Sequence, residues 1–104
     1  MVTLDGLYAG WMILNELMGE LSRRGVFIPD LTYADLRNSK TILEYLREFG
    51  GDVRALDGTD ERLREEMETK ILSLRDTLMV WAEDREGVDY RRMWEQRFDD
   101  AIHE

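Results

Sequence analysis

Apolar side chains recur at steps of three and four residues along most of the chain, a spacing that predicts amphipathic α-helices. The first such stretch, residues 4–24, keeps a 3.5-residue repeat that is typical of a helix packed lengthwise against partner helices. Gly25 follows two arginines, so we expect the helix to end there, with cations in its last turn. The repeat consists of Leu4, Leu7, Trp11, Leu14, Met18 and Leu21.

Three further stretches with the same spacing predict helices over residues 32–49, 60–85 and 89–102, the last two separated by Glu86-Gly87. Short connections between long amphipathic helices favour an all-α fold, a four-helix, mostly antiparallel bundle. A length of 104 residues leaves room for one hydrophobic core, so we expect a single helical domain over residues 1–104. The residues expected to be buried are Leu7, Trp11, Leu14, Leu43, Leu46, Leu74, Leu78, Trp81, Trp94 and Phe98.

Polar residues that can cap helices precede three of these stretches. Thr32 is the expected N-cap of the second helix, Thr59 or Asp60 of the third, and Asp89 of the fourth. The glycine pair at 50–51 is expected to end the second helix, because glycine is the commonest residue just past a helix end.

Composition and charge narrow the classes of partner. The chain has 23 Asp and Glu residues against 14 Lys and Arg residues, a formal net charge of −9, which disfavours phosphate backbones and anionic membrane surfaces. The absence of cysteine removes disulfides, thiolate metal sites and a cysteine nucleophile. No apolar run is long enough to span a bilayer, and the N-terminus lacks the positive charge of a signal peptide. We expect a cytoplasmic protein that needs no cofactor and binds neither membranes nor nucleic acid.

One candidate catalytic pair lies near the C-terminus. Arg97 and His103 are separated by five residues, a spacing that resembles the motif of the helical ribonucleases known as HEPN domains. That resemblance implies an arginine that binds the scissile phosphate and a histidine that assists proton transfer. In that family a polar residue commonly follows the arginine, whereas Phe98 stands here. We therefore interpret His103 as an exposed terminal histidine and keep a nuclease as the alternative.

Acidic residues supply a second enzyme alternative. Glu65 and Glu68 match one half of the motif of helical nucleoside-triphosphate pyrophosphatases, which the chain resembles in size and acidity. That family binds magnesium with a Glu-x-x-Glu on one helix and a Glu-x-x-Asp on a following helix, and no Glu-x-x-Asp lies within the predicted helix that follows. A lone histidine also cannot build a carboxylate-bridged di-metal site. We interpret the acidic run as a solvated helix face and expect no metal site.

The three tryptophans form the most distinctive aromatic feature. Trp11, Trp81 and Trp94 each fall on the apolar stripe of their helix, so we expect them to meet in the core where the first, third and fourth helices pack. The alternative is that one of them anchors an interface, a role that tryptophan often fills.

The first helix carries more apolar surface than one packed face needs. Met12 and Ile13 fall off its heptad seam, and Leu17 widens it, so the helix is apolar over most of its circumference. Gly6 and Gly10, four residues apart, would allow another helix to approach closely. These five residues predict an interface with a second copy, as a homodimer, or with another protein. A non-enzymatic interaction or self-association module is thus the leading interpretation, and an RNA- or nucleotide-processing enzyme is the alternative.

A family resemblance covers residues 8–46. The stretch Arg23-Arg24-Gly25…Pro29…Asp35-Leu36-Arg37…Lys40-Thr41-Ile42-Leu43, preceded by Trp11 and Leu14, is similar to a family of small helical archaeal proteins with no assigned activity. The resemblance implies a helical fold and an archaeal, cytoplasmic source, and it supplies no catalytic residues.

Overall fold

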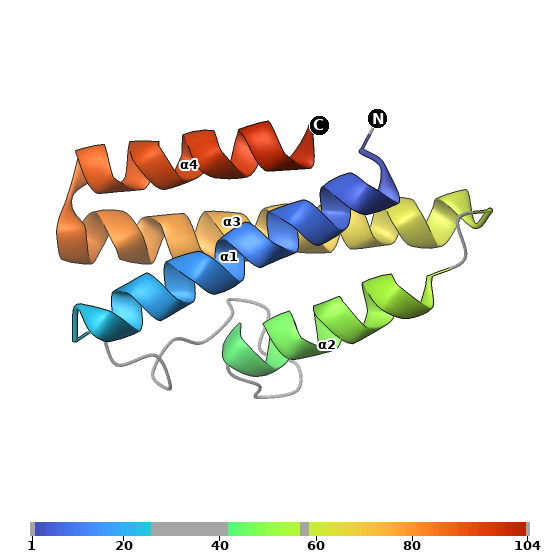
Figure 1. Cartoon of the computed structure of the whole chain (residues 1–104), viewed down its shortest axis with the longest axis horizontal. Coiled ribbons are helices and arrows are strands. Elements are labelled where there is room, and N and C mark those ends of the chain that lie inside the picture. The colour runs from blue at the N-terminus through green and yellow to red at the C-terminus, as the bar shows by residue number, and fades with distance from the viewer. Residues whose placement is uncertain (1, 26–41, 57–58, 104) are drawn as a thin grey trace.

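The computed structural model describes residues 2–25, 42–56 and 59–103, and within these ranges the chain is helical without strands (Figure 1). Four helices follow one another within the described residues, which confirms the predicted four-helix all-α fold. The predicted start of the second helix, with its cap at Thr32, lies outside the described residues. The helices are α1 (Leu4–Arg23), α2 (Ile42–Ala55), α3 (Glu61–Glu86) and α4 (Val88–Ile102).

Neighbouring helices in the bundle run mostly antiparallel, as the short connections indicated. Helices α1, α3 and α4 pack against one another, and α2 covers α1 and α3. Helix α4 runs antiparallel to both α1 and α3, and the described ends of the chain lie near the same end of the bundle (Figure 1). None of the described helices is both long and apolar enough to span a membrane.

Several helix ends lie at or next to the residues that the sequence predicted for them. Helix α1 ends at Arg23, and Gly25 adopts a φ of 87°. Asp60 caps α3, because its side chain accepts a hydrogen bond of 3.1 Å from the backbone N–H of Leu63. Gly87, with a φ of 97°, separates α3 from α4. Residues other than glycine rarely adopt the positive φ that these two positions have.

Two predicted helix bounds are wrong. Helix α4 begins at Val88 with Gly87 as its N-cap, so Asp89 lies in the first turn, where a carboxylate still favours the positive end of the helix dipole. Helix α2 continues through Gly50 and Gly51 to Ala55. The glycines do not end it, because Val53 is buried in the core and the continued turn therefore gains tertiary packing.

The core contains most of the residues that the apolar pattern predicted. Seven of the ten are buried, while Leu43, Trp11 and Trp81 are only partly buried and pack against the core from outside. The tryptophans therefore do not meet as predicted. The indole N–H of Trp11 donates to the carbonyl oxygen of Leu46 on α2 at 2.6 Å, and the guanidinium of Arg85 lies 5.0 Å from the Trp81 ring centroid. Trp94 alone of the three is buried.

Candidate functional site

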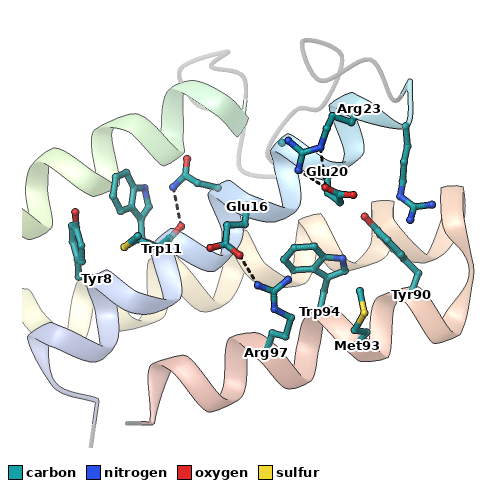
Figure 2. A pocket seen from close by; sticks show the side chains of 13 residues that line it. Tyr8, Trp11, Glu16, Glu20, Arg23, Tyr90, Met93, Trp94 and Arg97 are labelled. Atoms are coloured by element: carbon teal, nitrogen blue, oxygen red, sulfur yellow. Dashed lines mark hydrogen bonds and ion pairs between the residues drawn. The ribbon is translucent and has the colours of Figure 1, made fainter.

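An open groove of about 750 Å³ lies between α1 and α4 (Figure 2). The two helices are close at the end where the termini lie and diverge toward the other end (Figure 1). Glycines permit the close approach: a Cβ on Gly10 would lie 3.1 Å from the Phe98 ring, and a Cβ on Gly6 would overlap the backbone of Ile102. The residues lining the α1–α4 groove are Tyr8, Trp11, Met12, Asn15, Glu16, Gly19, Glu20, Arg23, Arg24, Tyr90, Met93, Trp94 and Arg97.

Aromatic rings and methionines make the apolar part of the groove. Tyr8 and Trp11 pack with their ring centroids 5.4 Å apart, and Tyr90 meets Trp94 edge-on at 6.3 Å. Met12 from α1 and Met93 from α4 leave 47% and 48% of their surface exposed. Flexible thioether side chains adapt to varied apolar partners, and exposed methionines are common on binding surfaces.

Charged side chains border this apolar surface. The Arg97 guanidinium binds the Glu16 carboxylate at 2.6 Å and thereby links α4 to α1 (Figure 2). Glu20 pairs with Arg23 on the same helix, and the hydrogen bond from Arg23 holds the pKa of the Glu20 carboxyl below its usual value. Arg24 lies over the Tyr90 ring, 4.7 Å from its centroid. Cation–π contacts of this kind leave the outer donors of the guanidinium accessible.

The groove differs in charge from the rest of the molecule. Three arginines and two glutamates line it, an excess of one positive charge. The whole chain has a formal net charge of −9, so the surface outside the groove is strongly acidic. A negatively charged partner would meet the least repulsion at the groove.

Two buried polar atoms beside the groove have no hydrogen-bond partner among the described residues. They are Nε1 of Trp94 and the hydroxyl oxygen of Tyr90. Trp94 is only 3% exposed, so water does not solvate its indole N–H freely. A buried polar group without a partner costs about 1–3 kcal/mol, and an acceptor supplied by a bound molecule would recover that cost.

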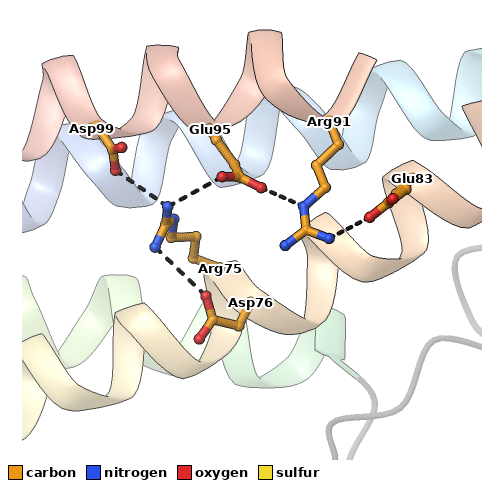
Figure 3. A network of polar contacts seen from close by, with 6 residues as sticks. All are labelled: Arg75, Asp76, Glu83, Arg91, Glu95 and Asp99. Carbon is orange, nitrogen blue, oxygen red and sulfur yellow. Dashed lines mark hydrogen bonds and ion pairs between the residues drawn. The ribbon is translucent and has the colours of Figure 1, made fainter. Parts of the chain in front are cut away.

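A second polar cluster lies between α3 and α4 and has a structural explanation (Figure 3). Arg75 on α3 forms ion pairs of 3.6 Å with Glu95 and 3.5 Å with Asp99 on α4. Arg91 bonds both Glu95 and Glu83, and these hydrogen bonds raise the pKa of its guanidinium. Every charge in this cluster faces an opposite one, so the network joins the two helices. The buried Nε of Arg75 is left without a hydrogen-bond partner among the described residues.

The residues predicted to form an interface through α1 are not all on the surface. Leu17 is buried in the core of its own chain, and Gly6 and Gly10 are buried against α4. Ile13 is partly buried and packs on the core. Met12 is exposed and lies in the α1–α4 groove. Most of the apolar excess of the first helix is therefore explained by its central place, between α2, α3 and α4.

The two halves of the nuclease-like pair lie in different surroundings. Arg97 is held by Glu16 in the groove. His103 is exposed at the C-terminal end of α4, where its backbone N–H bonds the Asp99 carbonyl oxygen at 3.3 Å, and it does not line the groove. The two side chains therefore do not line a common pocket among those described.

We predict that His103→Ala leaves the fold unchanged. An exposed side chain in the last helical turn contributes little, so the free energy of unfolding should change by no more than about 0.5 kcal/mol. Chemical denaturation monitored by circular dichroism measures this difference, with Ile102→Ala as a control that removes a buried residue from the same turn and should cost about 2 kcal/mol or more. A large effect of His103→Ala would show that the imidazole has a partner.

The pyrophosphatase-like carboxylates lie on one helix. Glu65 lines a shallow hollow of about 380 Å³ together with Arg62, Glu66 and Thr69, all from α3, and Glu68 is not among its lining residues. Within the described ranges, no three His, Cys, Asp or Glu residues group closely enough to hold a metal ion.

Several groove residues were not singled out from the sequence as functional. Tyr90 and Trp94 follow the apolar stripe of α4 and were interpreted as core, with an interface anchor as the alternative for the tryptophan, and Met93 and Arg24 were assigned no binding role. What these residues share is that they face the space between the diverging helices α1 and α4. Periodicity assigns residues to a helix face but does not give the angle between two helices, so this groove had no signal in the sequence.

Comparison with known proteins supports the fold. A family model described as the DUF2096 N-terminal four-helical bundle domain matches residues 7–104. The match extends well beyond the stretch at residues 8–46 on which the sequence resemblance was based. No curated protein and no solved structure shows significant similarity to the chain.

Proposed function

We propose that this chain, which belongs to the DUF2096 N-terminal four-helical bundle domain family, is a non-enzymatic interaction module that binds an amphipathic helix in the α1–α4 groove. The observation that carries the proposal is the pair of half-exposed methionines, Met12 and Met93, which line the groove together with its aromatic rings. An amphipathic helix that lays its apolar face into a hydrophobic groove is a recurring mode of peptide recognition.

An interaction role fits the arrangement of polar groups better than catalysis does. The charged residues that line the groove are each paired within the chain, as Arg97 is with Glu16 and Arg24 with Glu86 outside the lining. A general acid or base needs a proton acceptor or donor within hydrogen-bond reach of a reacting atom, together with a group that orients it. The candidate catalytic residues among the described ones do not converge in this way, so the enzyme is the weaker interpretation. The proposal includes a cytoplasmic location, which the sequence favoured.

Selection of helical peptides tests the proposal. A library of amphipathic helical peptides is first selected on the immobilised chain. We expect the enriched peptides to bind the Met12→Glu/Met93→Glu variant of the chain at least tenfold more weakly than the unmodified chain. Burial of one such side chain is worth roughly 1.5–3 kcal/mol, and tenfold corresponds to about 1.4 kcal/mol. The matched control is Val80→Glu, since Val80 is 57% exposed on α3 and does not line the groove.

The groove assignment fails if the enriched peptides bind the doubly substituted chain as tightly as the unmodified one, or if Val80→Glu weakens them equally. A second copy is the alternative occupant, and a mass measurement in solution distinguishes it. A dimer that Met12→Glu dissociates and Val80→Glu leaves intact would keep the interaction function and identify the groove as a self-association surface.

A further inference from the structure

We propose that the helix bound in the α1–α4 groove is an acidic segment of another protein, with apolar anchors over Met12 and Met93 and carboxylates on the arginines at the border. This inference rests on the proposed function and adds the chemistry of the partner. Three separate features of the groove support it: its charge, its unused hydrogen-bond donors and its length.

The charge of the groove favours a carboxylate-bearing partner. The side chains of Arg23, Arg24 and Arg97 are 70%, 46% and 45% exposed. A guanidinium has five N–H donors, and among the described residues each of these arginines bonds one carboxylate, so further donors are left for a partner. The two glutamates of the groove are already engaged by arginine, which leaves little acidic surface for a basic partner.

Two buried polar groups beside the groove also favour a partner that brings hydrogen-bond acceptors. The indole N–H of Trp94 is a donor only, and it is the polar atom of a side chain that is 97% buried beside the groove. The Tyr90 hydroxyl, one turn earlier on α4, also lacks a partner among the described residues. Both atoms are buried in the unbound chain, so the side chains around them would have to shift before a carboxylate oxygen or a backbone carbonyl of the bound segment could bond them. A cationic side chain offers the indole N–H no acceptor.

The dimensions indicate a polypeptide helix rather than a small molecule. The groove residues of α1 run from Tyr8 to Arg24, about 24 Å at the rise of an α-helix. This length corresponds to roughly four to five helical turns, a little more than the average helix of globular proteins. On the α4 side the lining runs from Tyr90 to Arg97, about 11 Å, so a bound helix would rest on α1 over its length and on α4 over about two turns.

A second copy of the chain supplies the wrong charge. If two copies met groove to groove across a two-fold axis, each would bring the same three arginines and two glutamates, and neither would neutralise the positive excess of the other. An acidic helix from a different protein neutralises it.

Two synthetic helical peptides test this inference on the unmodified chain. Both carry the same leucine anchors at i, i+3, i+4 and i+7 along about 16 residues; one has glutamate at the flanking positions and the other lysine. Isothermal titration calorimetry should give about tenfold tighter binding of the glutamate peptide, from a few partly exposed charge pairs. The difference should shrink as the salt concentration rises, because ions screen exposed charges.

Charge reversal provides the matched variants. Arg24→Glu/Arg97→Glu should abolish or invert the preference, whereas Arg62→Glu should retain it, because Arg62 is 88% exposed on α3 and does not line the groove. Circular dichroism and thermal unfolding establish that each variant is folded before binding is measured.

If the two peptides bind equally well and Met12→Glu/Met93→Glu abolishes the binding of both, the inference of an acidic partner is wrong and the proposed function stands. Binding of either peptide that persists unchanged on Met12→Glu/Met93→Glu would overturn both proposals. A groove-mediated homodimer that excludes the glutamate peptide would overturn the inference in favour of a second copy.

Discussion

Replacing Gly50 with alanine is expected to lower the free energy of unfolding by about 3 kcal/mol. The new Cβ would lie 2.7 Å from Cε2 and 2.9 Å from Cη2 of the Trp11 indole, well inside van der Waals contact. The indole cannot move aside without cost, because its N–H donates to the Leu46 carbonyl oxygen one turn earlier on α2. The loss would shift the Tm by more than about 10 °C in a domain of this size.

Gly51→Ala is the matched control for this change. Both glycines lie in α2, and a Cβ on Gly51 meets no atom of the described residues within 4 Å. Alanine has the higher helix propensity, so Gly51→Ala should stabilise the protein by roughly 0.5–1 kcal/mol. Thermal and urea denaturation of the two variants measure the contrast. Equal effects at Gly50 and Gly51 would mean that Trp11 does not rest on α2.

The second large effect is expected at Gly6. A Cβ there would overlap the backbone carbonyl oxygen of Ile102 and lie 3.2 Å from Cγ1 of Val2, so α1 and α4 would have to separate. We expect Gly6→Ala to cost about 2 kcal/mol, partly offset by better helix propensity. Gly19→Ala is the control on the same helix, because its nearest neighbour is the flexible end of Arg23 at 3.8 Å.

The dependence on protein concentration separates two roles for Gly6. If it packs α1 on α4 within one chain, the Tm of both the unmodified chain and Gly6→Ala is independent of concentration. If it lies between two chains, as the small-residue spacing suggested, dilution lowers the Tm of the unmodified chain. If the Tm of the unmodified chain depends on concentration and the Tm of Gly6→Ala does not, this glycine lies in an interface between two chains.

The helical fold could be predicted because its signals are local. The apolar repeat defined α1, and capping chemistry placed Asp60 and Gly87 at helix boundaries within one or two residues. Gly50 shows the limit of such signals. Its neighbours in sequence suggest a helix end, whereas its neighbour in space, Trp11, accounts for a glycine inside a continuing helix. The contact between Gly50 and Trp11 joins two helices that are distant in sequence, so no local sequence pattern could predict that α2 continues through the glycines.

The candidate site was predicted only in part. Met12 was placed on a surface, and it lies there. Trp94 was assigned to the core and is indeed buried, but its unpartnered N–H beside a groove becomes visible only once α1 and α4 are placed. Residues with an interaction role and residues of the core share one apolar stripe, so periodicity does not separate them.

The indole signals of the three tryptophans in a ¹H–¹⁵N NMR spectrum test the central claim most directly. On titration with the glutamate peptide, the Trp94 indole N–H should move strongly downfield as it gains an acceptor, and Trp81, which does not line the groove, should stay unchanged. A shift confined to Trp81, or saturation of binding with the Trp94 signal unmoved, would contradict the assignment of the α1–α4 groove as the site that holds an acidic helix.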